Sequence, residues 1–341
     1  MSLSPAITVT LGNLRYTTQV AQVQVELNNL PGVGRFQVTL PPTVELTAVP
    51  GDAVELSLEG GEGEELVLTG TVQRVQRGLW STVVVGVDGG ATLAQFRPAA
   101  TYERQSAKQI IQALAGEVNL SVGRVELEVP LAAYVAHQGR TAAEHIALLA
   151  ELGGAIAQFD ANNALTVVSA AVSQPELALR YGRELLAYSV EERAAPAQQL
   201  ALIGHGPAGS ADAPNALRHS LKGVPDNAPA AGRQTVRRSV ALLRSPQVAQ
   251  RASQAATQQA ARLTQQVTAH TFLLPALRPG TVLEVQDLPD GLASGAWLLT
   301  RVQHWLDPLH GGSTTFEGVT VAPAGLLDGL LGSALSALGG L

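Results

Sequence analysis

The sequence contains no cysteine, and only 4% of its 341 residues are aromatic. The absence of cysteine excludes a disulfide scaffold, a thiolate nucleophile, a cysteine zinc site and an iron–sulfur cluster. Long apolar runs are also missing, because the stretch 329–341 is too short and too rich in Gly and Ser to span a bilayer. We therefore expect no membrane span. The first residues lack a secretory signal pattern, which predicts a chain made and retained in a cytosol.

Positive charge is in deficit as well. The 22 basic residues against 28 acidic ones give a net charge of −6, the wrong sign for a dedicated nucleic-acid binder. The length predicts two or more domains. The acidic run at 62–65 follows two glycines and precedes a strand, so we interpret it as a solvated hairpin tip rather than as paired carboxylates for glycoside hydrolysis.

The sequence offers little material for catalysis. None of the seven histidines has the spacing that places two imidazoles on one metal ion, and no serine lies in a Gly-x-Ser-x-Gly elbow. His145 and His304 fall within a predicted helix and a predicted strand, where a hydrogen-bonded structural histidine is the usual explanation. We predict no catalytic residue, no metal site and no cofactor.

The chain begins with apolar residues at every second position from 6 to 87, which indicates short antiparallel strands closing into a barrel or sandwich. The period changes at Ser106, which caps a short helix that Gly116 ends. Thr141 to Glu144 match a capping box before an apolar helix, and a hairpin follows over 155–168. These elements predict a small α/β insert over 99–172.

Strand patterns return at 185–190 and 199–203, and a stretch rich in Gly, Pro, Ala and Asn follows at 204–232. We interpret that stretch as an exposed flexible linker. Ser245 and Pro246 predict the start of a helix over 245–268 with an Ala-rich stripe, and further strands extend to 321.

The last segment, 322–341, consists almost entirely of Leu, Ala and Gly, and its leucines have helical spacing. Four glycines argue against a stable free helix, so docking on a partner competes with disorder as its interpretation. We favour docking, with these residues as the contacts: Leu326, Leu327, Leu330 and Leu331.

One pattern occurs twice. Pro50-Gly51 feeds an alternating segment and is followed 24 residues later by Arg-Val-Gln, and Pro279-Gly280 is followed by Arg-Val-Gln after 22 residues. Two unrelated hairpins could share these common turn residues. The more specific interpretation, which we favour, is that the chain contains two copies of one β-domain.

Three segments resemble phage late control protein D and related tail baseplate hubs. Residues 134–154 resemble the family's helix-and-hairpin signature, and 106–111 fits the helix that opens its insert. Residues 277–285, continuing through Gly295 to 302–304 and 314–317, resemble its pattern of Pro-Gly, Gly, His and Thr-x-Phe-Glu. The sequence departs from the family at 141–145, where many members carry a phenylalanine.

The resemblance implies a mainly β fold with an α+β insert and two tail-tube-like antiparallel β-barrels in one chain. The first barrel would occupy 1–98, completed by strands within 173–203, and the second 173–321. It also implies a homotrimer that adapts the sixfold tail tube to a threefold spike, as in the hub part of type VI secretion VgrG proteins. Three chains would carry a charge of −18, three times −6, which suits a channel that lets DNA pass.

The partners implied are a tail tube or tube-initiator protein, a separate spike protein, the tape measure and baseplate wedge proteins, with DNA as transient cargo in an infectious phage. The expected location is the tail baseplate of a contractile phage or phage-tail-like particle, and no enzyme activity is expected.

Two other classes of function compete with this one. A glycan-binding or glycan-cleaving tail protein would show exposed aromatic platforms, and a soluble enzyme would show a deep pocket with clustered titratable groups.

Overall fold

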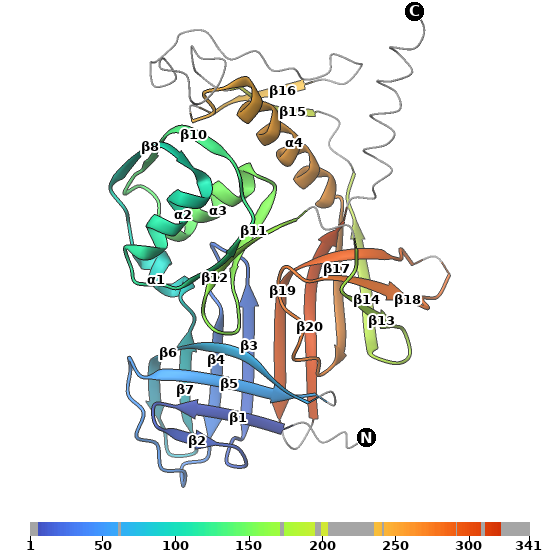
Figure 1. The fold of residues 1–341 in the computed structure, drawn as a ribbon. Helices are drawn as coiled ribbons and strands as arrows, with labels where there is room; N and C mark the ends of the chain where they lie inside the picture. Colours follow the sequence, from blue (N-terminus) through green and yellow to red (C-terminus); the bar gives the residue numbers. More distant parts are fainter. Residues whose placement is uncertain are drawn as a thin grey trace, which may run out of the picture.

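The computed structural model describes residues 6–60, 63–170, 174–194, 199–203, 235–240, 242–290, 292–307 and 311–321. A large twisted sheet forms the lower part of the molecule and a smaller α/β unit lies above its first half (Figure 1). The protein is mainly β, as predicted. The predicted linker at 204–232 and the predicted docking leucines of 322–341 lie outside the described residues.

Strands account for most of the described elements. Their bounds are β1 Ala6–Leu11, β2 Leu14–Tyr16, β3 Gln22–Asn28, β4 Arg35–Leu40, β5 Ala53–Glu59, β6 Glu64–Arg77, β7 Thr82–Val87, β8 Ala100–Ser106, β9 Val122–Val125, β10 Pro130–Ala136, β11 Ala155–Phe159, β12 Leu165–Ser169, β13 Leu177–Arg180, β14 Leu185–Glu192, β15 Gln199–Ile203, β16 Thr235–Ser239, β17 Gln265–Phe272, β18 Val282–Gln286, β19 Gly295–Asp307 and β20 Gly311–Thr320. The helices are α1 Gly90–Gln95, α2 Ala107–Gly116, α3 Ala142–Leu152 and α4 Pro246–Arg262.

The main sheet has 13 strands in the order β14-β17-β20-β19-β3-β4-β7-β6-β5-β1-β2, with β18 paired to β19 and β13 paired to β18. We call β1–β7 the first half and β13, β14 and β17–β20 the second half. Each half has its own apolar core. The alternation seen in the sequence is realised directly, since β4 buries every second residue, including Phe36 and Val38.

The two halves follow the same pairing order. In the first half the order is β3-β4-β7-β6-β5-β1, and in the second half it is β14-β17-β20-β19-β18-β13. Strands that occupy the same place also follow one another in the same order along the chain. One pair differs, because β13 runs parallel to β18 whereas β1 runs antiparallel to β5. The expectation of purely antiparallel pairing is therefore wrong for β13.

The repeated sequence pattern adopts the same local structure twice. Gly51 and Gly280 both have positive φ, of 100° and 84°, a conformation in which glycine avoids a side-chain clash. The Gly51 N–H donates to the Val72 carbonyl and the Gly280 N–H donates to the Leu299 carbonyl, each at 2.8 Å. In each copy the register then shifts by a bulge directly before the Arg-Val-Gln segment.

The insert has a separate core between α2, α3 and its small sheets. Both predicted helix starts are confirmed, because Ser106 and Thr141 each complete a capping box with the residue three positions later. The hairpin β11–β12 is also confirmed. Helix α4 packs on this unit rather than on the main sheet, with Val248, Ala249 and Ala252 buried in the same core.

The expected end of the third helix needs correction. The third helix ends at Arg262, not near 268, because 265–272 pair with β14 and β20, and Val267 faces the second core from β17. Tertiary pairing overrides the helical spacing of Val267.

Candidate assembly interface

The two halves of the sheet join along one strand pair. Residues 301–306 of β19 pair antiparallel with 23–28 of β3, so that Gln303 lies opposite Glu26 and His304 opposite Val25. This pair makes one continuous run of eight strands, β14-β17-β20-β19-β3-β4-β7-β6. Its backbone ladder joins segments that lie 273 to 283 positions apart in the sequence.

A charge cluster accompanies this junction. The Glu26 carboxylate accepts from Arg301 Nη2 at 2.8 Å and from Arg35 Nη2 at 2.6 Å, and Arg301 also reaches Glu317 at 3.2 Å. Glu26 itself is only 8% exposed. Burial raises the pKa of Glu26, but hydrogen bonds from Arg35 and Asn28 and the charges of Arg35 and Arg301 outweigh burial and hold the pKa below its usual value.

A second contact lies beside the junction. The Arg278 guanidinium donates to the backbone carbonyls of Leu66, at 3.0 Å, and Val67 in β6. Arg278 directly precedes the Pro279-Gly280 turn of the second half. The two halves are thus held by backbone pairing, an ion cluster and a half-buried cation on carbonyl oxygens.

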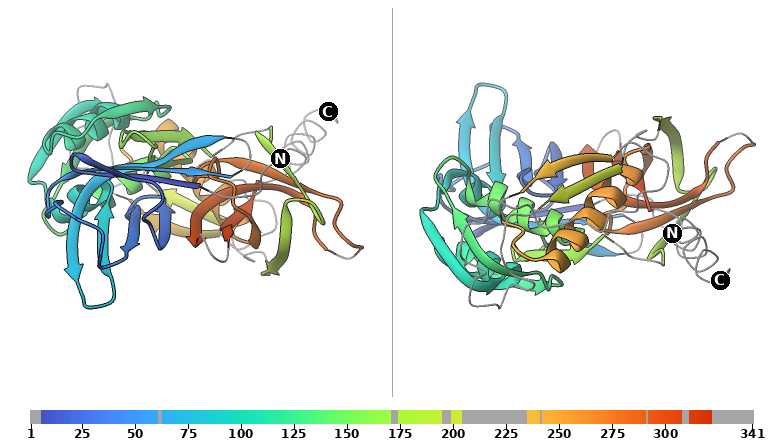
Figure 2. Two further views of the ribbon diagram at one scale, coloured as in Figure 1. Left: turned by 90° about the horizontal axis from the view of Figure 1, so that it is seen from below. Right: turned by 90° about the horizontal axis from the view of Figure 1, so that it is seen from above.

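The strands at the two ends of this eight-strand run have open edges. In the described part of the chain, β14 forms a ladder only with β17, apart from a single bridge between Leu185 and Tyr181, and the segment of β6 beyond its bulge, Arg74–Arg77, pairs only with β7. By pairing order, β14 corresponds to β3 and β6 corresponds to β19, the two strands that form the internal junction. Figures 1 and 2 show β14 and the β6–β7 hairpin on opposite sides of the molecule. Open edges of this kind invite pairing with another chain.

Apolar side chains are exposed near both edges. Leu79 and Trp80, at the tip of the β6–β7 hairpin, are each 88% exposed. The hairpin projects from the body of the molecule in both views of Figure 2. Near the other edge, Tyr181 and Leu186 are 46% and 48% exposed. Exposed large apolar side chains at an open edge indicate an interaction surface.

One face of the eight-strand run packs on the two cores, and we call the opposite face the open face. Glutamine, threonine and serine, as in Gln24, Gln37 and Thr268, are its commonest residues, and β7 contributes valines. For β6 and β19, only the residues that follow the bulge belong to this face. The charged residues of the open face are Arg35, Arg74, Arg301, Glu26, Glu191, Asp307 and Glu317. Three cations and four anions leave a net charge of −1.

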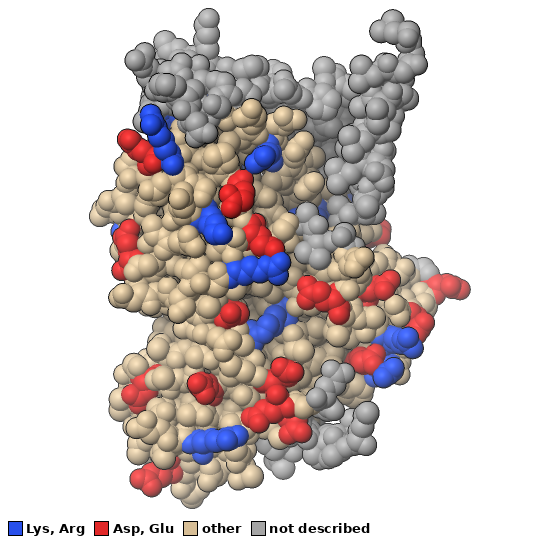
Figure 3. All heavy atoms as spheres, viewed as in Figure 1, with Lys and Arg blue, Asp and Glu red and all other residues tan. Residues whose placement is uncertain are grey.

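Figure 3 shows acidic and basic side chains interspersed over the side of the molecule seen in Figure 1. No single-sign patch of the kind that grips a phosphate backbone is visible there.

Three buried titratable groups, His145, His304 and Asp88, have structural partners. His145 Nδ1 lies 2.6 Å from the Tyr134 hydroxyl, and its Nε2 lies 3.1 Å from the His137 carbonyl. His304 Nδ1 lies 2.9 Å from Thr314 Oγ1, and burial lowers the pKa of His304 to about 3, so the ring is neutral. Asp88 accepts from the Gly34 and Gly90 N–H groups at 3.0 and 2.8 Å, and its burial raises its pKa to about 7.

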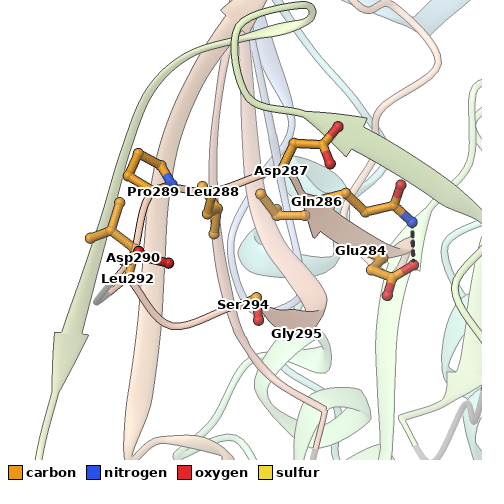
Figure 4. A pocket seen from close by; sticks show the side chains of 10 residues that line it. Glu284, Gln286, Asp287, Leu288, Pro289, Asp290, Leu292, Ser294 and Gly295 are labelled. Carbon is orange, nitrogen blue, oxygen red and sulfur yellow. Dashed lines mark hydrogen bonds between the residues drawn. The ribbon is translucent and has the colours of Figure 1, made fainter.

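A surface hollow of about 580 Å³ lies at the β18–β19 connection. Glu284, Asp287 and Asp290 line it, and Glu284 accepts from Gln286 Nε2 at 2.8 Å (Figure 4). No aromatic side chain is among its lining residues, so it lacks the stacking platform that a glycan site uses.

Within the described ranges, no three His, Cys, Asp or Glu residues lie close enough to hold a metal ion, and no helix is long and apolar enough to cross a membrane.

Sequence reasoning missed the residues that form this interface. The Arg-Val-Gln repeat pointed to Arg74 and Arg301, but nothing local to β3 marked Glu26 as the partner of Arg301. The exposure of Leu79 and Trp80 was also not predicted, because an apolar pair in a turn resembles any buried hairpin until the surrounding strands are placed.

Similar folds occur in tail proteins. A tail protein from Neisseria meningitidis MC58 aligns over 93% of this chain and 96% of its own, with a TM-score of 0.68 and 14% identity. The 43 kDa tail protein of prophage MuSo2 from Shewanella oneidensis aligns over 93% and 98%, with a TM-score of 0.64 and 16% identity. At these identities the likeness establishes the fold alone.

A third similar structure is an E. coli component of the type VI secretion system, described as structurally similar to the T4 tail proteins gp27 and gp5. It aligns over 92% of this chain and 76% of its own, with a TM-score of 0.60 and 13% identity. No curated protein sequence matches the chain.

The family model of the phage tail baseplate hub (GPD) matches residues 29–308. This range begins at the end of β3 and includes the insert and most of the second half. The family consists of structural proteins of the tail baseplate. The chain therefore belongs to the phage tail baseplate hub (GPD) family.

Proposed function

We propose that this protein is the central hub of the baseplate in a contractile phage tail or phage-tail-like particle, and that it acts as a homotrimer. In this role it adapts a sixfold tail tube to a threefold spike and forms part of the central channel. The family membership supports the baseplate assignment. The trimer and the adapter role rest on the geometry of the sheet.

The equivalence of the two halves carries the proposal. Each half has the same strand order, and one half meets the other through β19 and β3. The corresponding strands at the ends of the run, β6 and β14, remain open on opposite sides of the molecule. Three chains joined head to tail through these edges would present six similar units around one axis. Such a ring matches sixfold symmetry on one side while keeping threefold symmetry in its chains.

Each half is proposed as one tube-type barrel. Its strands surround a separate apolar core, with Val25 and Phe36 in the first and Val302 and Phe316 in the second. Closing the ring would also remove two exposed strand edges from every chain, which suppresses unspecific edge-to-edge aggregation.

The open face is proposed to line the channel. Its net charge of −1 per chain and its many amide and hydroxyl side chains would neither attract nor strongly repel a polyanion. Arginine does not dominate it, since Arg35, Arg74 and Arg301 are outnumbered by acidic residues on the same strands. DNA or another cargo could pass along such a wall without binding.

We propose a tail tube or tube-initiator protein on one side of the ring and a separate spike protein on the other. The tape measure and baseplate wedge proteins are further proposed neighbours. The leucines at 326, 327, 330 and 331 remain proposed docking residues for one of these partners.

The native mass of the purified chain tests this function, measured alone and with the spike protein. A mass near 106 kDa, three times 35.4 kDa, or a complex of three chains with three spike chains supports the adapter. A chain that stays monomeric alone and remains monomeric with both the spike and the tube protein would refute it.

A further inference from the structure

The internal repeat can be followed across the sheet residue by residue. In the first half Val72 lies opposite Gly86, Gly86 opposite Phe36, and Phe36 opposite Val25. In the second half the corresponding succession begins at Leu299. It runs through Gly318 and Val267 to Val190. Val25 and Val190 therefore occupy equivalent positions.

This register assigns equivalents to the ion pair at the internal junction. Glu26 follows Val25 and Glu191 follows Val190, so the two carboxylates correspond. Arg301 and Arg74 are each the first residue after the bulge, so the two guanidinium groups correspond as well. Within the chain, Arg301 Nη2 lies 2.8 Å from Glu26 Oε1. Their equivalents, Arg74 and Glu191, lie on opposite open edges of the same molecule.

We propose that β14 of one chain pairs antiparallel with Arg74–Arg77 of a second copy, with Gln76 opposite Glu191 and with an ion pair between Arg74 and Glu191. The contact repeats between chains the β19–β3 junction that exists within each chain. It rests on the proposed trimer and specifies which residues close it.

The present surroundings of the two groups fit this pairing. Arg74 is exposed and its side chain has no hydrogen bond or ion pair with any described residue. Glu191 accepts from Arg193 through both carboxylate oxygens, at 2.9 and 3.2 Å, and remains exposed. Glu26 at the internal junction is held by two arginines, and Glu191 would acquire its second from the neighbouring chain.

An apolar contact accompanies the ion pair. Leu306, five residues after Arg301, is fully buried in the core of the first half. Leu79, five residues after Arg74, is 88% exposed. In the proposed register the hairpin tip lies along the start of β14, where Leu186 is exposed. The second copy would bury both side chains.

Charge reversal tests the ion pair in the full chain. Arg74→Glu and Glu191→Arg should each weaken the trimer at least about tenfold, because each places like charges at all three junctions. The combined variant Arg74→Glu with Glu191→Arg should restore much of the affinity. Arg15→Glu, at an exposed arginine on β2 away from both open edges, is the matched control and should leave the mass unchanged. Circular dichroism would establish that each variant is folded.

Cysteine pairs test the register, since the chain has no cysteine of its own. Gln76→Cys with Glu191→Cys should give covalent oligomers up to trimer under oxidation, because directly opposed Cβ atoms lie within disulfide range. Gln76→Cys with Ala187→Cys is the control. That pair is displaced by four residues, roughly 13 Å along the strand, and should not cross-link.

Two results distinguish failure of this contact from failure of the hub trimer. If the wild-type chain is a trimer, if both charge-reversal variants form that trimer equally well, and if cysteines at 76 and 191 do not cross-link, the proposed contact is wrong but the trimer is not. A wild-type chain that never oligomerises, alone or with its partners, and does not cross-link would overturn both.

Discussion

At the scale of single residues, Glu26 has the clearest electrostatic role. Two arginines from different parts of the chain converge on one nearly buried carboxylate, Arg35 from the adjacent strand and Arg301 from the second half. Both arginines are substantially exposed, which weakens the attraction relative to a fully buried pair. The carboxylate is nevertheless the common partner, so its removal would leave two guanidinium groups facing each other.

Glu26→Gln should lower the free energy of unfolding by roughly 1–2 kcal/mol at pH 7. The folded-state pKa of Glu26 lies below its usual value of 4.5, so its contribution is present above that value and is lost as pH falls through the folded-state pKa. Urea denaturation at pH 7 and at pH 3 would measure this. The variant should differ from wild type at pH 7 and approach it at pH 3.

Glu55→Gln serves as the control, because Glu55 is exposed on β5 and has no ion pair within the described part of the chain. It should stay close to wild type at both pH values. A difference between Glu26→Gln and wild type that is the same at pH 3 as at pH 7 would contradict the electrostatic explanation.

At the scale of elements, the insert depends on well-capped helices. In α3 the Thr141 side chain accepts from the Glu144 N–H at 3.3 Å, and the Glu144 carboxylate accepts from the Thr141 N–H at 2.7 Å. The helix that follows buries Ile146 and Leu149 in the insert core. The cap therefore fixes the start of a helix whose packing organises the whole unit.

Thr141→Ala should destabilise the protein by about 1 kcal/mol, since it leaves a helix N–H without its side-chain acceptor. Thr141→Ser keeps the hydroxyl and should remain within a few tenths of a kcal/mol of wild type. Thermal unfolding of the three proteins would compare them. Equal losses in the two variants would indicate that the methyl group, not the cap, matters at this position.

Local patterns predicted such elements well. The capping boxes, the β11–β12 hairpin and the alternation of β4 and β7 depend on residues within a few positions of one another, and all were readable from the sequence. The end of α4 was not, because 265–272 are drawn into the sheet by β14 and β20. The short helix α1 was also missed, since its six residues carry no capping side chain.

At the scale of the whole molecule, the sequence repeat predicted duplication but not the junction that follows from it. The pairing of β3 with β19 joins segments far apart in the chain, and no local signal identifies such partners. The open edges, the open face and the exposed hairpin tip are consequences of that pairing. The interface could therefore be recognised only after the strands had been placed in space.

Trp80 reports on whether the ring forms. In the single chain it is 88% exposed, whereas Trp297 is buried in the second core. If the β6–β7 hairpin lies along a neighbouring chain, the Trp80 indole should leave water on assembly, and its fluorescence should shift to shorter wavelength. The difference between wild-type and Trp80→Phe spectra isolates this contribution, because the other two tryptophans are common to both.

The same difference spectrum measured on the Arg74→Glu background supplies the unassembled reference. We expect Trp80 to emit as a solvent-exposed indole in that variant and as a covered one in the wild-type trimer, with reduced quenching by iodide. A trimer in which Trp80 remains as exposed as in the Arg74→Glu variant would place the hairpin outside the ring. The tip would then take no part in the contact, and cross-linking of Gln76→Cys with Glu191→Cys would decide whether Arg74–Arg77 pair with β14 of a neighbouring chain.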